Sequence, residues 1–288
     1  MALGYVYAAI AILIWGVTFV NTKALLVNFS AFEILVIRFA AAYVALWIVA
    51  PRRHRLRSWR EEGVYAAMGV TGVALYQFLE NCAIHSTNAS NVSIIVSACP
   101  MGTAVLSALL LREKALTRRF VAGFLLAMTG IVLVCLNGVT ECHFSPFGDF
   151  LAFGAMASWS LYSVLITRIN VRDCDPVLVI RRTFFWGLVA MAPFVPGGFD
   201  FDGARNLARF SSPLMLVHLG FLGFLASALC YILWNRACRA LGTVRATCGI
   251  YLTPAITAVA AYLILGETLT VTAVVGAVIT VIGVILCG

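Results

Sequence analysis

The sequence predicts an all-α integral membrane protein of ten transmembrane helices, arranged as two inverted five-helix repeats. Three observations support this prediction. Of the 288 residues, 62% are hydrophobic and only 11% are charged, whereas a soluble domain carries about 25% charged residues. The apolar residues gather in ten runs, each close to the roughly 20 residues that a helix needs to cross a bilayer. Finally, the second half of the chain repeats a long pattern from the first half, which indicates a repeat architecture.

The repeated stretch has the pattern P-x-x-T-A-V-x-x-x-L-x-L-x-E, and its two copies lie 154 residues apart. The first copy begins at Pro100 and ends at Glu113. The second copy begins at Pro254 and ends at Glu267. A duplication of this length predicts two structural units of the same kind.

The apolar runs predict helices rather than strands, because they show no alternation and because a helix satisfies its own backbone groups in lipid. Their connections are short, so we expect the helices to pack as one bundle without a soluble domain. The first unit, 1–142, and the second unit, 143–288, hold five runs each. The approximate limits of the runs are 3–23, 32–50, 64–84, 91–111, 120–138, 148–167, 177–195, 213–234, 246–265 and 271–287.

Basic residues between the runs predict the orientation, since they concentrate on the cytoplasmic side of a membrane protein. Placing both termini on the cytoplasmic side puts fourteen of the twenty Lys and Arg residues in the inner loops. These loops are 51–63, 112–119, 167–176 and 235–245. Five crossings per unit then invert the second unit relative to the first. This arrangement is typical of secondary transporters, whose substrate site lies near the midplane between the repeats.

Two charged residues fall inside apolar runs, where charges are costly and usually face a cavity or a partner. Glu80 lies toward the outer part of the third run. One alternative is that Glu80 snorkels to the outer surface or pairs with Lys23. The other is a cavity carboxylate that binds a substrate amino group or takes up a proton. Arg38, in the second run, has a counterpart in Arg181. This duplication favours a structural ion pair or anchor over a substrate contact.

Aromatic side chains supply a second group of candidates. Trp15 and Trp159 occupy matching positions near the middle of the first and sixth runs, away from the interfaces where tryptophan is commonest. They either pack in the core or form a flat wall for a substrate. Polar side chains on neighbouring runs would supply the few polar groups that an apolar pocket needs. These predicted substrate-binding residues are Tyr76, Asn81, Ser93, Ser97, Tyr162, Tyr231, Asn235 and Tyr251.

The two ends of the repeated stretch predict structural roles. Pro100 and Pro254 lie eight or nine residues into their runs, where a proline removes a backbone hydrogen bond and kinks the helix. The kink is either a static feature of the bundle or a hinge that moves during gating. Glu113 and Glu267 end their runs shortly before a Leu-Thr pair. There a carboxylate would cap or tether the start of the next helix.

The sequence resembles those of the drug/metabolite transporter superfamily, EamA type. The resemblance rests on ten runs in two five-run repeats, each with the P-x-x-T-A-V stretch. Within that family, the chain is similar to exporters of aromatic amino acids. The resemblance implies a central cavity, a small-molecule substrate such as an amino acid or a related metabolite, and export across a bacterial inner membrane. It also favours the substrate-wall role for Trp15 and Trp159. Drugs or nucleotide sugars are alternative substrates on the same fold.

Other functional classes have less support in the sequence. The nucleotide-binding pattern G-x-x-x-x-G-K-[ST] is absent, so transport would draw on a gradient of substrate or of protons, with Glu80 as the proton candidate. The patterns of an intramembrane enzyme are absent as well, and the inverted repeat argues against a channel. We predict no cofactor, and no metal site because the potential ligands lack a repeated spacing. We predict no nucleic-acid partner because the basic residues behind the net charge of +8 lie in short loops between the apolar runs. The oligomeric state is left open.

Overall fold

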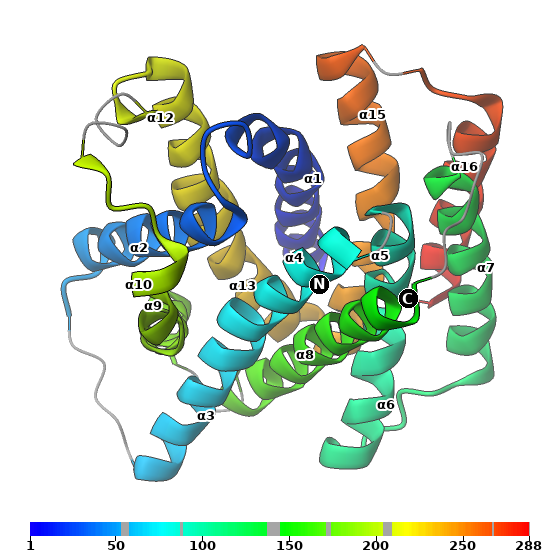
Figure 1. Ribbon diagram of the computed structural model, residues 1–288. Helices are drawn as coiled ribbons and strands as arrows, with labels where there is room; N and C mark the ends of the chain where they lie inside the picture. The colour runs from blue at the N-terminus through cyan, green and yellow to red at the C-terminus, as the bar shows by residue number, and fades with distance from the viewer. Residues whose placement is uncertain are drawn as a thin grey trace.

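The chain is an all-α protein in the computed structural model, which describes residues 1–52, 58–86, 89–136, 145–170, 174–203, 209–266 and 268–287. Helices make up most of these residues, and no strand occurs among them (Figure 1). The predicted all-α fold is therefore confirmed. The predicted boundary between residues 142 and 143 lies outside the described residues.

Each predicted run of the first unit coincides with a helix or with consecutive helical segments. The third run is a continuous helix from residue 59 to residue 86, in which a π-helical segment lies between two α-helices. The fourth run is interrupted at Ser97 and Ala98. The segments are α1 (Ala2–Leu25), α2 (Ala31–Val49), α3 (Trp59–Gly69), η1 (Val70–Leu75), α4 (Tyr76–Ser86), α5 (Ala89–Val96), α6 (Cys99–Leu111) and α7 (Arg118–Cys135).

The second unit repeats this order. Its third run again holds a π-helical segment, and its fourth run is again interrupted. The segments are α8 (Pro146–Asn170), α9 (Pro176–Met191), η2 (Ala192–Phe194), α10 (Val195–Gly198), α12 (Pro213–Gly220), η3 (Phe221–Leu229), α13 (Cys230–Leu241), α14 (Thr243–Cys248), η4 (Gly249–Leu252), α15 (Thr253–Leu265) and α16 (Val271–Cys287).

Seven helices are long and apolar enough to cross a membrane, judged by length and composition within the described residues. Among them are α2, α7 and the continuous stretches Pro213–Leu241 and Thr243–Ile264. The chain also has shorter apolar helices at Ala2–Thr18 and in α16. These helices make the chain a multi-pass membrane protein, whereas the count of ten crossings stays a prediction.

Pro100 and Pro254 stand at helix starts rather than inside helices. α5 ends at Val96, and α6 begins at Cys99 with Pro100 in its first turn. In the second unit, the 3-10 turn Gly249–Leu252 separates α14 from α15, whose first turn holds Pro254. A proline fits the first turn because the N–H that it lacks would have no helical partner there. The predicted mid-helix kink is therefore a break between two helices in both units.

Both third runs contain a π-helical segment, a rare geometry that is frequent at functional sites. The segment η1 ends at Leu75 and the segment η3 ends at Leu229. These two leucines are equivalent at the 154-residue offset of the repeat. The two units therefore share a detail of backbone geometry as well as the order of their helices.

The two units pack through reciprocal contacts. α1 contacts α13 and α15 of the second unit, while α8 contacts α4 and α6 of the first. In the same way, α2 packs on η3, while α9 packs on α3 and η1. Each pairing thus occurs twice with the units exchanged, as a twofold relation between them requires. The fifth helices, α7 and α16, lie side by side at one edge of the bundle (Figure 1).

Glycines allow the closest of these helix contacts. A Cβ atom at Gly69 of α3 would lie 2.5 Å from the carbonyl oxygen of Thr183 on α9. A Cβ atom at Gly130 of α7 would lie equally close, 2.5 Å from the carbonyl oxygen of Gly276 on α16. Small residues of this kind let membrane helices approach until their backbones touch. The glycines therefore fix how the two units meet at the bundle centre and at its edge.

Candidate functional site

Eight aromatic side chains meet where the two units join, and we call them the central aromatic cluster. Trp15 of α1 and Trp159 of α8 lie at its middle, with ring centroids 5.6 Å apart. Tyr231 of α13 contacts both tryptophans, at 5.9 and 6.0 Å. The full set is Trp15, Phe39, Tyr76, Trp159, Tyr162, Phe184, Tyr231 and Trp234. The structure thus brings five predicted site residues together, and they come from both units.

Two members of the cluster are fixed by hydrogen bonds to the π-helical segments. Trp15 Nε1 donates to the carbonyl oxygen of Ala226 in η3 at 2.9 Å. Tyr231 Oη donates to the carbonyl oxygen of Gly72 in η1 at 3.0 Å. Gly72 and Ala226 are equivalent at the 154-residue offset. A π-helical turn disturbs the regular α-helical bonding of its carbonyl groups, and here a side chain of the other unit supplies the donor.

Several polar atoms at the cluster are buried without a hydrogen-bond partner in the described part of the chain. They are Trp159 Nε1, Tyr162 Oη, Trp234 Nε1 and both amide atoms of Asn235. An unpartnered buried polar group costs about 1–3 kcal/mol, and a native structure keeps few of them. These atoms are therefore the groups at the bundle centre that are most ready to bind a polar ligand.

Two charged side chains border the cluster. Tyr76 Oη donates to Glu80 Oε1 at 3.0 Å, which ties this carboxylate to the edge of the cluster. Arg38 is only 9% exposed, and its Nε donates to Ser227 Oγ of η3 at 2.9 Å. The side chain of Lys23, the predicted alternative partner of Glu80, lies outside the described part of the structure.

Asn81, Asn235 and Ser97 lie close to the cluster without belonging to it. Asn81 follows Glu80 on α4 and is half-buried. Asn235 follows Trp234 on α13 and is fully buried. Ser97 is buried in the break between α5 and α6, whose neighbouring residues pack against the core that holds the cluster.

Ser93 and Tyr251 lie apart from the cluster, and their role in substrate binding stays a prediction. Ser93 is on α5 beside Cys135 of α7. Tyr251 is fully buried, with its ring 6.3 Å from Phe124 of α7. The break before α15 explains its position, because a 3-10 turn changes the direction of side chains relative to a continuous helix.

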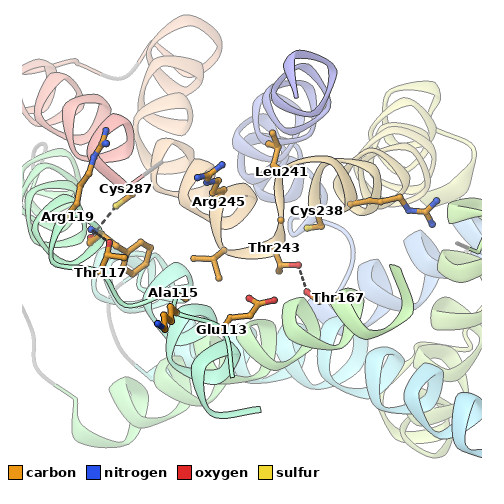
Figure 2. Close-up of a pocket in the computed structure, with 15 residues that line it drawn as sticks. Glu113, Ala115, Thr117, Arg119, Thr167, Cys238, Leu241, Thr243, Arg245 and Cys287 are labelled. Carbon is orange, nitrogen blue, oxygen red and sulfur yellow. Dashed lines mark hydrogen bonds between the residues drawn. The ribbon is translucent and has the colours of Figure 1, made fainter. Parts of the chain in front are cut away.

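A pocket of about 670 Å³ opens at the ends of α8 and α13 and at the loop after α6 (Figure 2). We call it the basic pocket, because Lys114, Arg119, Arg239 and Arg245 line it together with one carboxylate, Glu113. On its wall, Thr167 of α8 and Thr243 of α14 share a hydrogen bond of 2.5 Å (Figure 2). Cys238 of α13 also lines the pocket. This residue is about one helical turn from Trp234, so a single turn of α13 separates the pocket from the aromatic cluster.

Glu113 has a different place from the predicted one. It is exposed and lines the basic pocket. The cap of α7 is instead Thr117, whose hydroxyl accepts from the backbone N–H of Phe120 at 3.1 Å. A hydroxyl next to the first turn reaches that N–H more easily than a carboxylate four residues earlier. The counterpart, Glu267, lies outside the described residues.

Three aromatic members of the cluster, Phe39, Phe184 and Trp234, were not predicted from the sequence. Of the three, Trp234 could have been predicted most easily. It lies three residues after Tyr231 and one before Asn235, both of them predicted site residues, and residues three apart share a helix face. The basic pocket had no such sequence pattern, because its residues come from loops and helix ends that are distant along the chain.

The chain matches a family model described as the EamA-like transporter family. The match occurs twice, over residues 2–136 and over residues 146–288. It therefore covers nearly the whole chain, once for each unit, and the described halves of the bundle correspond to the two matches.

Individual proteins are similar along nearly their whole length. An "Uncharacterized transporter" of Archaeoglobus fulgidus is 28% identical, over 96% of this chain and 94% of that protein. A "Probable amino-acid metabolite efflux pump" of Escherichia coli is 25% identical, over 96% and 92%. A "Probable terminal-alkyne amino-acid exporter" of Streptantibioticus cattleyicolor is 24% identical, over 96% and 90%. One crystal structure shares the fold with a TM-score of 0.80 and 17% identity, over 99% of this chain and 96% of that one.

Proposed function

The chain belongs to the EamA-like transporter family, and we propose that it exports amino acids, aromatic or otherwise hydrophobic, or closely related small metabolites by alternating access. As a member of that family it is a multi-pass protein of the lipid bilayer that acts on a small molecule. Two relatives, named "Probable terminal-alkyne amino-acid exporter" and "Probable amino-acid metabolite efflux pump", support this substrate class.

The observation that carries the proposal is the central aromatic cluster. Sites for small molecules are mostly apolar and aromatic, with a few polar groups that fix orientation. The cluster offers aromatic faces for a hydrophobic side chain, and unpartnered atoms of Trp159, Tyr162 and Asn235 for polar groups. Its residues come from both units, so any change in the packing of one unit on the other rearranges the site.

The proposed topology has ten crossings, two inverted units, both termini in the cytoplasm, and a bacterial inner membrane. The reciprocal contacts of α1 with α13 and of α8 with α4 support the twofold relation of the units. In this orientation the basic pocket faces the cytoplasm, because its lining belongs to the predicted inner loops 112–119 and 235–245 and to the adjacent helix ends.

A transport cycle follows from this placement. Substrate enters the basic pocket from the cytoplasm and reaches the aromatic cluster past Cys238 and Asn235 on α13. The cluster is packed against itself, so release to the other side requires the units to move. The helix breaks before Pro100 and Pro254 are the proposed hinges, since helices joined by a break bend there at low cost. If a proton is coupled, Glu80 is the residue that carries it.

A second candidate is export of drugs or other metabolites on the same fold. The four basic side chains of the pocket favour anionic metabolites among these. A channel has less support, because the aromatic cluster fills the centre of the bundle where a channel would need an open pore.

Counterflow in proteoliposomes tests the proposal. Vesicles are preloaded with one unlabelled amino acid and diluted into the same labelled amino acid, and we expect transient accumulation of labelled phenylalanine or tryptophan. Trp159→Ala should slow this accumulation about tenfold or more, because several ring contacts of about 1 kcal/mol each are lost. Phe153→Ala is the matched control, because Phe153 lies on the same helix and is 57% exposed. Absence of accumulation with every amino acid, in protein shown to be folded, would contradict the proposal.

A further inference from the structure

We propose that Arg38 and Glu80 recognise the two charged ends of a zwitterionic substrate, with the guanidinium binding its carboxylate and the carboxylate of Glu80 binding its ammonium group. This inference rests on the proposed function and names the substrate class of the same site. It makes the two residues determinants of specificity: a molecule with both charges on one carbon is accepted, and a molecule that lacks either charge is not.

Only part of the Arg38 guanidinium is hydrogen-bonded at the bundle centre, within the described residues. Its Nε donates to Ser227 Oγ at 2.9 Å, and its guanidinium carbon lies 5.2 Å from the ring centroid of Phe39. Within the described residues, its two terminal amino groups make no hydrogen bond and no ion pair. An arginine presents these two groups as a fork that matches a carboxylate. A buried charge in a membrane protein ordinarily faces a partner or a cavity, and here the ready partner is a substrate carboxylate.

Arg181, the counterpart of Arg38, shows what a structural arginine does in this fold. Its two terminal amino groups donate to the backbone carbonyl groups of Ala50 and Arg52, just beyond α2. Its guanidinium carbon also lies 3.8 Å from the ring centroid of Trp47. Arg181 is therefore an anchor with both terminal groups satisfied, whereas Arg38 keeps the same groups available.

Glu80 is the opposite charge at the same cluster. One carboxylate oxygen accepts from Tyr76 Oη at 3.0 Å, and the Tyr76 ring lies 5.1 Å from Trp159. Unlike Glu62, which pairs with Arg182 at 2.8 Å, Glu80 has no ion pair within the described part of the chain. It is half-buried, and its second oxygen, which has no hydrogen bond within the described residues, can accept from an ammonium group.

The two charges are placed for a ligand that joins them. Arg38 lies on α2 and Glu80 on α4, two helices that contact each other, and the two side chains make no direct ion pair among the described residues. Both border the same aromatic cluster, since the guanidinium of Arg38 lies over the ring of Phe39 and Glu80 accepts from Tyr76. An α-amino acid carries its ammonium, carboxylate and side chain on a single carbon. Its two charges would meet Glu80 and Arg38 while its side chain enters the aromatic cluster.

Competition in the counterflow assay tests this inference with three probes of one shape. Phenylalanine carries both charges, phenethylamine lacks the carboxylate, and 3-phenylpropanoate lacks the ammonium group. We expect phenylalanine to compete with labelled phenylalanine at a concentration about tenfold lower than either analogue, because each charge-assisted hydrogen bond is worth about that factor. Equal competition by the three probes would overturn the inference while leaving the proposed function intact. Failure of every amino acid to support counterflow would instead overturn the proposed function itself.

Variants then assign each charge to its residue. Arg38→Gln should lose the preference for phenylalanine over phenethylamine and keep the preference over 3-phenylpropanoate. Glu80→Gln should show the converse pattern, and Arg38→Lys and Glu80→Asp should restore part of each preference. A structural role alone would lower transport of every probe equally, so an unchanged order of preference in folded variants would overturn the assignment. The probe series on the unaltered protein decides the substrate class even if one variant fails to fold.

Discussion

Residues 59–86 and residues 213–241 are equivalent helical runs, one in each unit, and their backbones agree more closely than their side chains do. Both contain a π-helical segment that ends at the equivalent position. In the α-helices that follow, however, the side chains differ at equivalent positions. Tyr76 of the first run corresponds to Cys230 of the second, and Glu80 corresponds to Trp234. The first run thus brings a carboxylate to the bundle centre, and the second brings an indole ring. The duplicated backbone provides the framework, and the divergent side chains provide a site without twofold symmetry.

The hydrogen bonds to the π-helical segments show the same break in symmetry. Trp15 donates to Ala226, so a symmetric bundle would have Trp159 donating to Gly72. Tyr231 donates to Gly72 instead, and Trp159 Nε1 has no partner in the described part of the chain. This difference leaves the indole N–H of Trp159 available to a ligand, and it identifies the contacts that mutagenesis can exchange between the units.

Gly72→Ala is expected to have the largest effect, because it should lower both stability and counterflow. A Cβ at Gly72 would lie 2.3 Å from Cδ2 of Tyr162, so the tyrosine ring must move. Overpacking of this kind costs about 1–3 kcal/mol and should lower the melting temperature in detergent and abolish most counterflow. The reverse exchange in the other unit, Ala226→Gly, removes only a methyl group and should cost about 0.5–1 kcal/mol. Equal losses from the two substitutions would contradict the asymmetry of the centre.

An intermediate effect is expected when the two side-chain donors are removed. Trp15→Phe leaves the carbonyl of Ala226 without its donor, which should cost about 1–3 kcal/mol. Tyr231→Phe should cost less, because the N–H of Trp159 has no partner among the described residues and lies next to η1, where the neighbouring Ser158 donates to the Thr71 carbonyl at 2.8 Å. Thermal unfolding of the two variants measures the difference. A larger loss from Tyr231→Phe would show that Trp159 cannot replace the lost donor.

The smallest effect on stability is expected at the two prolines. Pro100→Ala and Pro254→Ala replace residues in the first turn of α6 and α15, where the missing N–H has no helical partner. Each should change the free energy of unfolding by less than about 1 kcal/mol. If the breaks are hinges, the initial rate of counterflow should fall in both variants by more than this small change in stability explains. Unchanged rates in both variants would make the breaks static features of the bundle.

Much of the fold was predictable from the sequence. The length of the hydrophobic runs indicates helices that can cross a membrane, and the internal repeat indicates two units of the same kind. Trp15 and Trp159 could be paired in advance, since they hold matching places in the two repeats, and the structure places their rings 5.6 Å apart. Their neighbours Tyr76 and Tyr231 lie on the third and eighth runs, and both were predicted site residues. These residues were accessible because each lies within one continuous helix.

Other features depend on geometry that no residue pattern specifies. The π-helical segments change backbone hydrogen bonding without a characteristic composition, so the roles of the Gly72 and Ala226 carbonyls were not predictable. Tyr251 belongs to the non-α turn before α15, and its ring packs on Phe124 of α7 rather than on the cluster. Arg38 and Arg181 looked alike in sequence, yet their surroundings give them different partners. In each case tertiary contacts decide what the local sequence leaves open.

Thiol accessibility on the two sides of the aromatic cluster tests alternating access most directly. Asn81→Cys, beside Glu80, and Val244→Cys, in the lining of the basic pocket, are introduced separately into a background without other cysteines that retains counterflow. Labelling by a membrane-impermeant reagent is followed in membrane vesicles of each orientation, with and without substrate. We predict that every condition that raises labelling at one position lowers it at the other. Labelling that rises at both positions together would contradict alternating access and indicate a continuous pore.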